Sequence, residues 1–255
     1  MSTIAITGSA SGMGAATRTR LEKAGHSVIG IDIRDADIIA DLGTVPGRRA
    51  AIDAVRKRTA NRLDGLVVCA GVGPQVEPWS TIVSINYFGA QVLLEGLRDA
   101  LAAGTQPAAV AVASNSASLP GVDTPIVEAC LAGDEEEARR LALTFSGHHA
   151  YAGSKLALTR WVRRNAPGPA WAGAGIRLNA VAPGVVMTPL LQGGLDHPVF
   201  GDAIRNFKVP LGNYGDPDQI AAMIAFLLGP DGSFCCGSMI FVDGGTDAML
   251  RPDNF

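Results

Sequence analysis

The stretch TGSASGMG, residues 7–14, decides the fold. It follows the apolar run TIAIT at residues 3–7, and three of its residues are glycines: Gly8, Gly12 and Gly14. Glycine lets the backbone turn tightly and come close to a pyrophosphate, whose charge then lies at the N-terminus of the next helix. The stretch therefore predicts a strand, a phosphate-binding turn and a helix over residues 13–24.

Apolar runs like TIAIT recur along the chain, and each is followed by a segment with helical spacing. They lie at residues 3–7, 27–32, 65–70, 108–113, 176–184 and 238–245. Because the runs are apolar on both faces, they are typical of parallel strands buried between helices. The chain has 255 residues, 47% of them hydrophobic, and this alternation predicts one α/β domain over residues 1–255. We expect a Rossmann-like, doubly wound parallel sheet with helices on both faces.

A helical insert interrupts this alternation at residues 117–148. It begins within the polar cluster SNSAS at residues 114–118, and residues 126–145 have the pattern of one or two helices. Spacing of i to i+4 predicts two ion pairs on a solvated helix face. These are Glu135 with Arg139 and Glu136 with Arg140. Farther along the chain, Pro167 and Pro169 predict that the helix after the insert ends early.

The charge and the cysteine content exclude several classes of protein. A formal net charge of -3 and a pI near 5.8 leave no basic surplus for nucleic acid or an anionic membrane. The four cysteines and four histidines have no metal-ligand spacing, so we expect no metal site. No stretch approaches the roughly 18 apolar residues of a membrane span, and we see no signal-peptide pattern. We therefore expect a cytoplasmic protein with reduced cysteines.

An acidic residue marks the end of the second predicted strand. Asp32 lies 18 residues after Gly14, where a carboxylate can accept hydrogen bonds from the ribose hydroxyls of NAD and repel the extra phosphate of NADP. Arg34 could bind that phosphate, but an arginine just after a strand is more often exposed to solvent. NAD is therefore the predicted cofactor.

The spacing T-G-x-x-x-G-x-G resembles that of the short-chain dehydrogenase/reductase family. Further motifs resemble the family in order: CAG at 69–71, INYFG at 85–89, YAGSK at 151–155, PGVVMTP at 183–189 and VDGG at 242–245. Within the family, the runs NYFGA, AYAGSK and GGTDAMLRP are similar to those of the bacterial 3α-hydroxysteroid dehydrogenases/carbonyl reductases. The resemblance implies an NAD-dependent oxidoreductase that interconverts a secondary alcohol and a ketone, with a 3α-hydroxysteroid and its 3-ketosteroid as the candidate pair.

Tyr151 and Lys155 are four residues apart, so on a helix they project from one face. A free tyrosine has a pKa near 10, whereas a proton donor and acceptor needs a pKa closer to about 7. This shift corresponds to roughly 4 kcal/mol, which a nearby ammonium and a positively charged nicotinamide can supply. Lys155 provides the ammonium. The resemblance also implies that Lys155 binds the nicotinamide ribose and that Asn86 holds a water linking it to solvent.

The resemblance implies a serine that binds the substrate oxygen, at the end of the strand before the catalytic helix. Ser114 follows the run AAVAVA and matches this position, 37 residues before Tyr151 because the insert intervenes. Ser116 remains an alternative, since Ala113 and Asn115 depart from the family pattern.

Three other polar residues near the site are expected to take no part in it. Ser118 is predicted to lie in a loop. His148 and His149 are adjacent at the entry to a helix, where histidines are more often solvent-facing than metal ligands or general bases. The sequence therefore offers one serine, or its alternative, as the only catalytic hydroxyl besides the tyrosine.

The resemblance also assigns the residues around the cofactor and the substrate. The cofactor residues are Gly8, Ser11, Gly12, Met13, Gly14, Asp32, Ile33, Asp41, Leu42, Ala70, Gly71, Tyr151, Lys155, Pro183, Gly184, Val186 and Thr188. The substrate residues are Ser114, Tyr151, Leu190 and Leu191. A substrate-binding loop is predicted over residues 188–215, where Leu195, Val199 and Phe207 either line an apolar pocket or pack the loop down.

Two other functions are compatible with these motifs. A broad carbonyl reductase of xenobiotic aldehydes and ketones needs the same catalytic residues, whereas a regulator without catalysis needs only the NAD site. Intact Asn86, Tyr151 and Lys155 favour an enzyme. The resemblance further implies a homodimer or a homotetramer, and the insert favours a dimer formed through another surface.

Overall fold

Seven parallel strands form one sheet in the computed structural model, which describes residues 1–198 and 201–254. The spatial order is β3-β2-β1-β4-β5-β6-β7. The strands are β1 Thr3–Thr7, β2 Ser27–Asp32, β3 Ile38–Ile39, β4 Gly65–Val68, β5 Ala108–Val112, β6 Arg177–Pro183 and β7 Met239–Val242. The predicted doubly wound parallel sheet is thus confirmed. Only β3 was not predicted, because two residues are too few to establish a periodicity.

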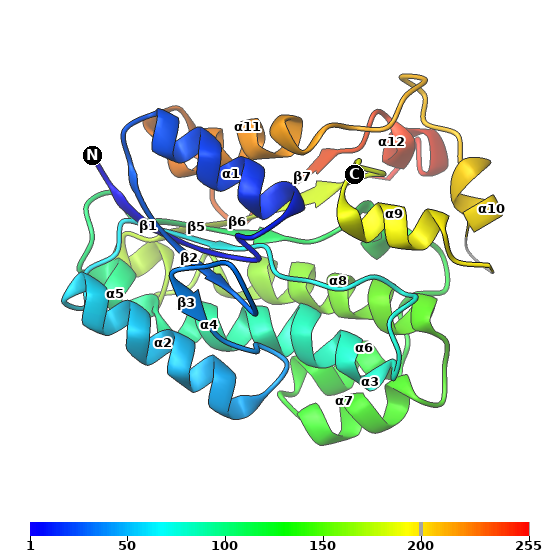
Figure 1. Cartoon of the computed structure of the whole chain (residues 1–255), viewed down its shortest axis with the longest axis horizontal. Coiled ribbons are helices and arrows are strands. Elements are labelled where there is room, and N and C mark those ends of the chain that lie inside the picture. The colour runs from blue at the N-terminus through cyan, green and yellow to red at the C-terminus, as the bar shows by residue number, and fades with distance from the viewer. Residues whose placement is uncertain (199–200, 255) are drawn as a thin grey trace.

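Helices cover both faces of the sheet (Figure 1). On one face α1 packs against α11, and on the other lie α2, α4 and α8. The helices are α1 Gly12–Lys23, α2 Val45–Thr59, α3 Ser80–Val83, α4 Ala90–Gly96, α5 Arg98–Ala102, α6 Pro125–Leu131, α7 Glu135–Ala142, α8 Gly147–Asn165, α9 Pro189–Leu195, α10 Gly201–Arg205, α11 Pro217–Leu228 and α12 Thr246–Leu250. Among the described residues, no helix combines the length and the apolar character needed to cross a membrane.

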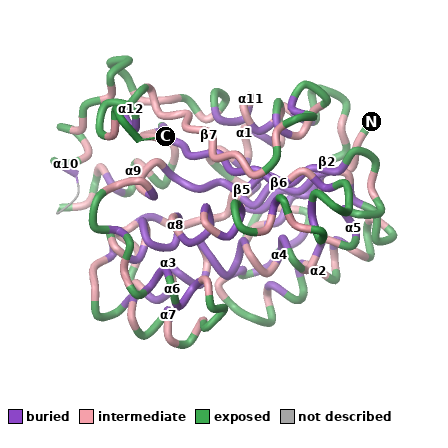
Figure 2. The backbone as a smooth tube through the Cα atoms, turned by 180° about the vertical axis from the view of Figure 1, so that it is seen from behind, coloured by how far each residue is buried: buried purple, intermediate pink, exposed green. Residues whose placement is uncertain are grey.

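The central strands separate two apolar cores. Leu66 of β4 packs into the core beneath α2, α4 and α8, and its neighbour Val67 packs into the core beneath α1 and α11. Successive side chains of a strand point to opposite faces, so one buried strand serves both cores. Figure 2 shows this burial as a band of purple along the middle strands. The fully apolar runs of the sequence therefore have a structural cause.

The turn between β1 and α1 requires glycine at two positions. Gly8 has a φ of +69°, and a Cβ atom there would lie 2.9 Å from backbone atoms of Ala70. A Cβ atom at Gly14 would lie 2.0 Å from the carbonyl oxygen of Gly8. The first turn of α1 therefore lies directly against the end of β1, as the stretch at residues 7–14 predicts.

The insert contains two helices, α6 and α7, and the next helix, α8, ends at Asn165 as the two prolines predict. The predicted ion pairs within α7 are wrong. Glu135 binds Arg48 of α2 instead of Arg139, and Arg140 binds Glu137 at i to i+3 spacing. Because α7 packs on the rest of the domain, its charges find tertiary partners that the helical spacing alone does not reveal.

Candidate active site

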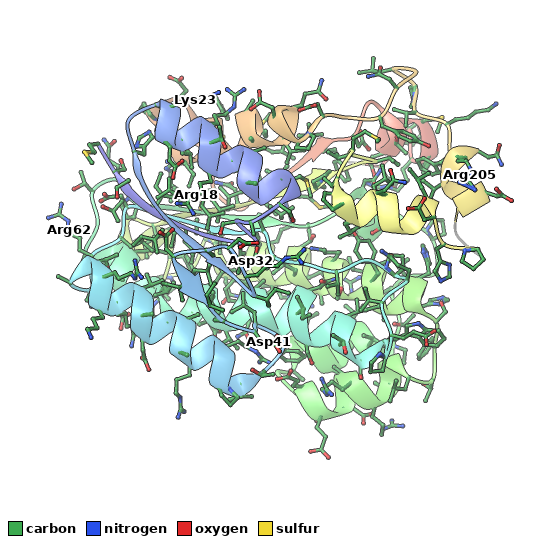
Figure 3. The ribbon with its side chains drawn as sticks, viewed as in Figure 1. Arg18, Lys23, Asp32, Asp41, Arg62 and Arg205 are labelled. Atoms are coloured by element: carbon green, nitrogen blue, oxygen red, sulfur yellow. The ribbon has the colours of Figure 1, made fainter. Side chains whose placement is uncertain are left out.

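The first cavity lies at the carboxyl ends of β1, β2 and β4 and has a volume of about 260 Å³. Figure 3 shows Asp32 and Asp41, which line it, between α1 and α2. The predicted cofactor residues in its wall are Gly8, Ser11, Gly12, Met13, Gly14, Asp32, Ile33, Asp41, Leu42, Ala70, Gly71 and Thr188. The structure therefore brings together the residues that the sequence assigns to the adenosine and pyrophosphate groups.

The N-terminus of α1 fits an anion. The side chain of Ser11, at the N-cap, makes no capping hydrogen bond, and the first turn of α1 contains no acidic residue. The backbone N–H groups and the helix dipole thus face the cavity without a competing negative charge. Gly12, with a φ of +53°, keeps the approach open, and a Cβ atom there would lie 3.3 Å from Thr188.

The carboxylate of Asp32 joins the end of β2 to the glycine turn. One oxygen accepts a hydrogen bond of 3.0 Å from the backbone N–H of Ala10, and the other accepts one of 2.7 Å from Ile33. A carboxylate has about four acceptor positions, so it can still bind two hydroxyls. Arg34 is exposed to solvent, as expected, and also borders the cavity.

A second cavity, of about 340 Å³, adjoins the first. Met13, Thr188 and Leu190 line both cavities. The other predicted residues in its wall are Ser114, its alternative Ser116, Tyr151, Pro183, Gly184, Val186, Leu191 and Phe207. Leu195 is not part of this wall, and Val199 lies outside the described residues.

The second cavity also contains residues that the sequence analysis did not assign. They include Gln75, Leu119, His148 and Ile204. His148 is exposed, as expected of a solvent-facing histidine, but it also borders the cavity one helical turn before Tyr151. Desolvation and the neighbouring His149 lower the pKa of His148. The i to i+3 spacing from Tyr151 is the sequence signal that could have identified it.

Helix α8 presents Tyr151 and Lys155 from one face, as predicted. The ammonium of Lys155 is only 4% exposed and donates a hydrogen bond of 2.8 Å to the carbonyl oxygen of Val112. Burial lowers the pKa of Lys155 to about 8. Burial also raises the pKa of Tyr151, although a hydrogen bond with Ser114 opposes this effect. The protein's own groups therefore do not bring the pKa of Tyr151 down toward neutrality.

Ser114 follows β5 and contacts Tyr151, and Ser116 also lines the second cavity. The Ser116 hydroxyl donates a hydrogen bond of 2.9 Å to the oxygen of Ser114, and the Ser116 backbone N–H donates one of 3.1 Å to the same oxygen. Since these bonds occupy acceptor positions of Ser114, its own proton can be donated toward Tyr151 or a substrate oxygen. The geometry favours Ser114 over Ser116 as the hydroxyl that contacts the substrate.

The C-terminal helix α12 anchors the turn that follows Ser114. Ser118 was expected in a loop but lies in a 3₁₀ turn, and its hydroxyl donates a hydrogen bond of 2.5 Å to Asp247. Asp247 also forms an ion pair of 2.8 Å with Arg251. Asn115 donates a longer hydrogen bond, 3.5 Å, to Asp243. Residues of and around α12 therefore help to hold the turn that follows Ser114 in place.

Asn86 braces the loop after β4. It is completely buried in a π-helical turn, Ser84–Gly89, and its amide group bonds both the N–H (2.8 Å) and the C=O (3.0 Å) of Val72. A Cβ atom at Gly71 would lie 3.2 Å from the Asn86 oxygen and 3.5 Å from the Lys155 nitrogen. Asn86 and Lys155 therefore meet at Gly71, in the region where the resemblance implies a proton relay.

Cys69 begins the CAG motif, residues 69–71, at the end of β4. The backbone N–H groups of Cys69 and Ala70 both donate to the hydroxyl of Thr7, at 2.9 and 3.0 Å. Burial raises the pKa of Cys69 to about 11, despite the opposing effect of Lys155. The residue is therefore a neutral thiol beside the ammonium at physiological pH.

Comparisons with known proteins agree with this arrangement. Residues 2–126 match the family described as short chain dehydrogenase, and residues 138–247 match that described as enoyl-(acyl carrier protein) reductase. The chain is 49% identical, over all of both chains, to a 3-alpha-hydroxysteroid dehydrogenase/carbonyl reductase from Comamonas testosteroni. The chain belongs to the short-chain dehydrogenase/reductase family. The family membership that the motifs predict is thus confirmed.

Two further members show how closely this short-chain dehydrogenase/reductase matches its relatives. The crystal structure of a 3-alpha-hydroxysteroid dehydrogenase from Pseudomonas sp. B-0831, complexed with NADH, is 54% identical, with a TM-score of 0.97 over all of both chains. A cis-4-hydroxycyclohexanecarboxylate dehydrogenase from Sinomonas cyclohexanicum is 30% identical over 96% of each chain. The insert and the catalytic helix therefore lie within a region of very similar structure in at least one member.

The buried ammonium of Lys155 predicts a pH-dependent cost in stability. The unfolded lysine titrates near pH 10.4, and the folded one near pH 8. Between these values the unfolded chain binds more protons, so the stability of the wild type rises with pH. Lys155→Met should be more stable than the wild type at about pH 7, by up to roughly 3 kcal/mol, and this advantage should shrink toward about pH 10.

Urea unfolding at about pH 7 and pH 9.5 measures this effect. The exposed Lys57→Met is the matched control for the loss of a positive charge. An advantage of Lys155→Met that stays constant across this pH range would show that the cost does not arise from the charged form.

Proposed function

We propose that this protein is an NAD(H)-dependent oxidoreductase that interconverts a 3α-hydroxysteroid and the corresponding 3-ketosteroid. The observation that carries the proposal is that Ser114 and Tyr151 face an apolar cavity that adjoins the glycine-turn cavity. A reacting carbon bound beside Tyr151 would be close to a dinucleotide bound at the glycine turn.

NAD rather than NADP is supported by Asp32. Its carboxylate lies in the first cavity, where it would bond the ribose hydroxyls and repel a 2′-phosphate. The Pseudomonas relative, complexed with NADH, supports the same choice. Arg34 is exposed and could bind the 2′-phosphate of NADP, so it is the residue that argues against a preference for NAD.

The proposed roles divide the chemistry among three side chains. NAD(H), when bound, accepts or donates the hydride. In oxidation the phenolate of Tyr151 takes the proton from the alcohol oxygen, and in reduction the Tyr151 hydroxyl gives its proton to the ketone oxygen, while Ser114 donates a hydrogen bond to that oxygen. Lys155, fixed by the carbonyl of Val112, stabilises the phenolate form of Tyr151 by its positive charge. Asn86 keeps the Gly71–Val72 backbone next to Lys155.

The cavity supports a bulky substrate with few polar groups. Its apolar lining includes Leu119, Leu190, Leu191, Ile204 and Phe207. The polar residues in the wall include Ser114 and Tyr151, which can orient one oxygen while the apolar lining buries a hydrocarbon skeleton. The Comamonas relative's name also includes carbonyl reductase, so broad reduction of xenobiotic ketones is the second candidate function.

A substrate panel tests the proposal. We expect oxidation of androsterone with NAD at a kcat/KM at least about tenfold higher than with NADP, and higher than the kcat/KM for small aromatic ketones with NADH. The absorbance of the reduced cofactor measures both directions. Turnover of the aromatic ketones without steroid oxidation would favour the carbonyl reductase, and cofactor binding without any turnover would favour a regulator.

Substitution of the two serines tests the proposed site. Ser114→Ala should reduce kcat by roughly 100-fold or more, since a positioned hydrogen bond to developing charge is lost. Ser116→Ala should have a much smaller effect, because its hydroxyl contacts Ser114. Tyr151→Phe, measured in parallel, should remove nearly all turnover. The reverse ranking of the serines would contradict this assignment.

We further propose that the protein works in the cytoplasm. Cys69, Cys130, Cys235 and Cys236 are all free thiols. Two of them, Cys235 and Cys236, are adjacent and not fully buried, a condition that a reducing compartment preserves.

We also propose a homodimer that forms along β7 and α11, away from the insert. All four residues of β7, the outermost strand on that side, remain partly accessible. Nearby, Phe234 is fully exposed and Phe226 is 41% exposed. Large apolar side chains gathered at an unpaired sheet edge favour burial against a second copy.

Phe234→Asp should convert the dimer into a monomer, because a carboxylate would replace the exposed ring at the interface. Light scattering coupled to size-exclusion chromatography measures the mass. Leu143→Asp, on the exposed surface after α7, is the matched control and should remain dimeric. Loss of the dimer in the Leu143 variant alone would place the interface on the insert instead.

A further inference from the structure

The insert is bound to the rest of the domain by a largely buried ion pair. Arg48 of α2 is only 3% exposed, and its guanidinium binds both carboxylate oxygens of Glu135, at 2.8 and 2.5 Å. Glu135 is the first residue of α7, and 87 positions separate the two partners. Two parallel charge-assisted hydrogen bonds fix the geometry of the pair as well as its distance.

The same guanidinium also binds the backbone next to the cofactor cavity. Its Nε atom donates a hydrogen bond of 2.9 Å to the carbonyl of Leu42, and Nη2 lies 3.4 Å from the carbonyl of Gly43. Leu42 and Asp41 line the first cavity. The strand before them, β3, has only two residues, so the sheet alone holds this loop weakly. Arg48 is therefore a major support of the loop.

The charge of Glu135 keeps Arg48 in this position. A buried guanidinium without a counter-ion is strongly disfavoured and would move toward solvent, releasing the carbonyl groups that it binds. The negative charge at the N-terminus of α7 also interacts favourably with that helix. Loss of the Glu135 charge should thus loosen the Leu42–Gly43 backbone although Glu135 does not line the first cavity.

A second contact of α7 reaches the other side of the site. Arg139, one turn after Glu135, donates a hydrogen bond of 2.6 Å to the hydroxyl of Ser84. Ser84 is completely buried and begins the π-helical turn that contains Asn86. The helical spacing would pair Glu135 with Arg139. Instead, Glu135 binds Arg48 of α2, and Arg139 binds the π-helical turn at Ser84.

We infer that the insert determines how tightly the protein binds the adenosine half of its dinucleotide. Glu135 and Arg48 are positioning residues: Glu135 holds Arg48, and Arg48 holds the Leu42 carbonyl beside the adenosine. The inference rests on the proposed function, since that function places the adenosine in the first cavity. It assigns a role in cofactor binding to the insert, which contributes no side chain to the wall of that cavity.

Binding of NADH and of 5′-AMP to purified Glu135→Gln tests the inference. The dissociation constants of both ligands, measured by calorimetry, should rise about tenfold and by the same factor, because AMP contains only the adenosine end. The KM for NADH should rise likewise while kcat changes less than about twofold. Glu136→Gln, the exposed neighbour on α7, is the matched control and should bind both ligands like the wild type.

A double variant separates this effect from a loss of folding. Arg48→Met with Glu135→Leu replaces the ion pair with apolar side chains, which preserves packing but removes the hydrogen bond to Leu42. It should fold, as circular dichroism would show, and still bind AMP about tenfold more weakly. Wild-type affinity for AMP in either variant, or a weakening for NADH alone, would overturn the inference. Failure of the wild type to bind NADH would instead refute the proposed function.

Discussion

The absence of side chains at Gly8 and Gly14 is the constraint on which this structure depends. It lets the first turn of α1 lie against the carbonyl of Gly8, so the helix starts directly beneath the end of β1. At this point the chain order in the sheet reverses, with β2 on one side of β1 and β4 on the other. Loops from the two sides diverge there, and the cofactor cavity is the space that they leave.

The catalytic side chains depend on supports from distant parts of the chain. Lys155 is held by the carbonyl of Val112, and the turn after Ser114 is held by Asp247. Burial of the Lys155 ammonium lowers the free energy of unfolding. The same burial holds the positive charge where it can act on Tyr151. Stability and catalysis therefore oppose each other at this position, a common feature of enzyme active sites.

Local signals made most of the fold and the site predictable. Apolar runs predict the strands because a strand buried on both faces has a continuous apolar sequence. The spacing of Tyr151 and Lys155 predicts that both lie on one face of a helix. The sequence analysis missed contacts between segments that are far apart in the chain. The partner of Glu135 lies 87 residues away, and His148 borders a cavity formed largely by other segments. No periodicity encodes the partner of Glu135, whereas the i to i+3 spacing from Tyr151 could have indicated His148. The sequence left Ser114 and Ser116 as alternatives, and the contact of Ser114 with Tyr151 and the two hydrogen bonds from Ser116 to Ser114 favour Ser114.

The contact between Ser118 and Asp247 has a practical consequence for handling the protein. Asp247 lies eight residues before Phe255, so a purification tag fused to Phe255 would perturb α12 and, through Ser118, the turn that follows Ser114. Met1 is fully exposed and precedes the amino end of β1, whereas both cavities lie at the carboxyl ends of the strands. A tag fused to Met1 would leave the active-site geometry undisturbed.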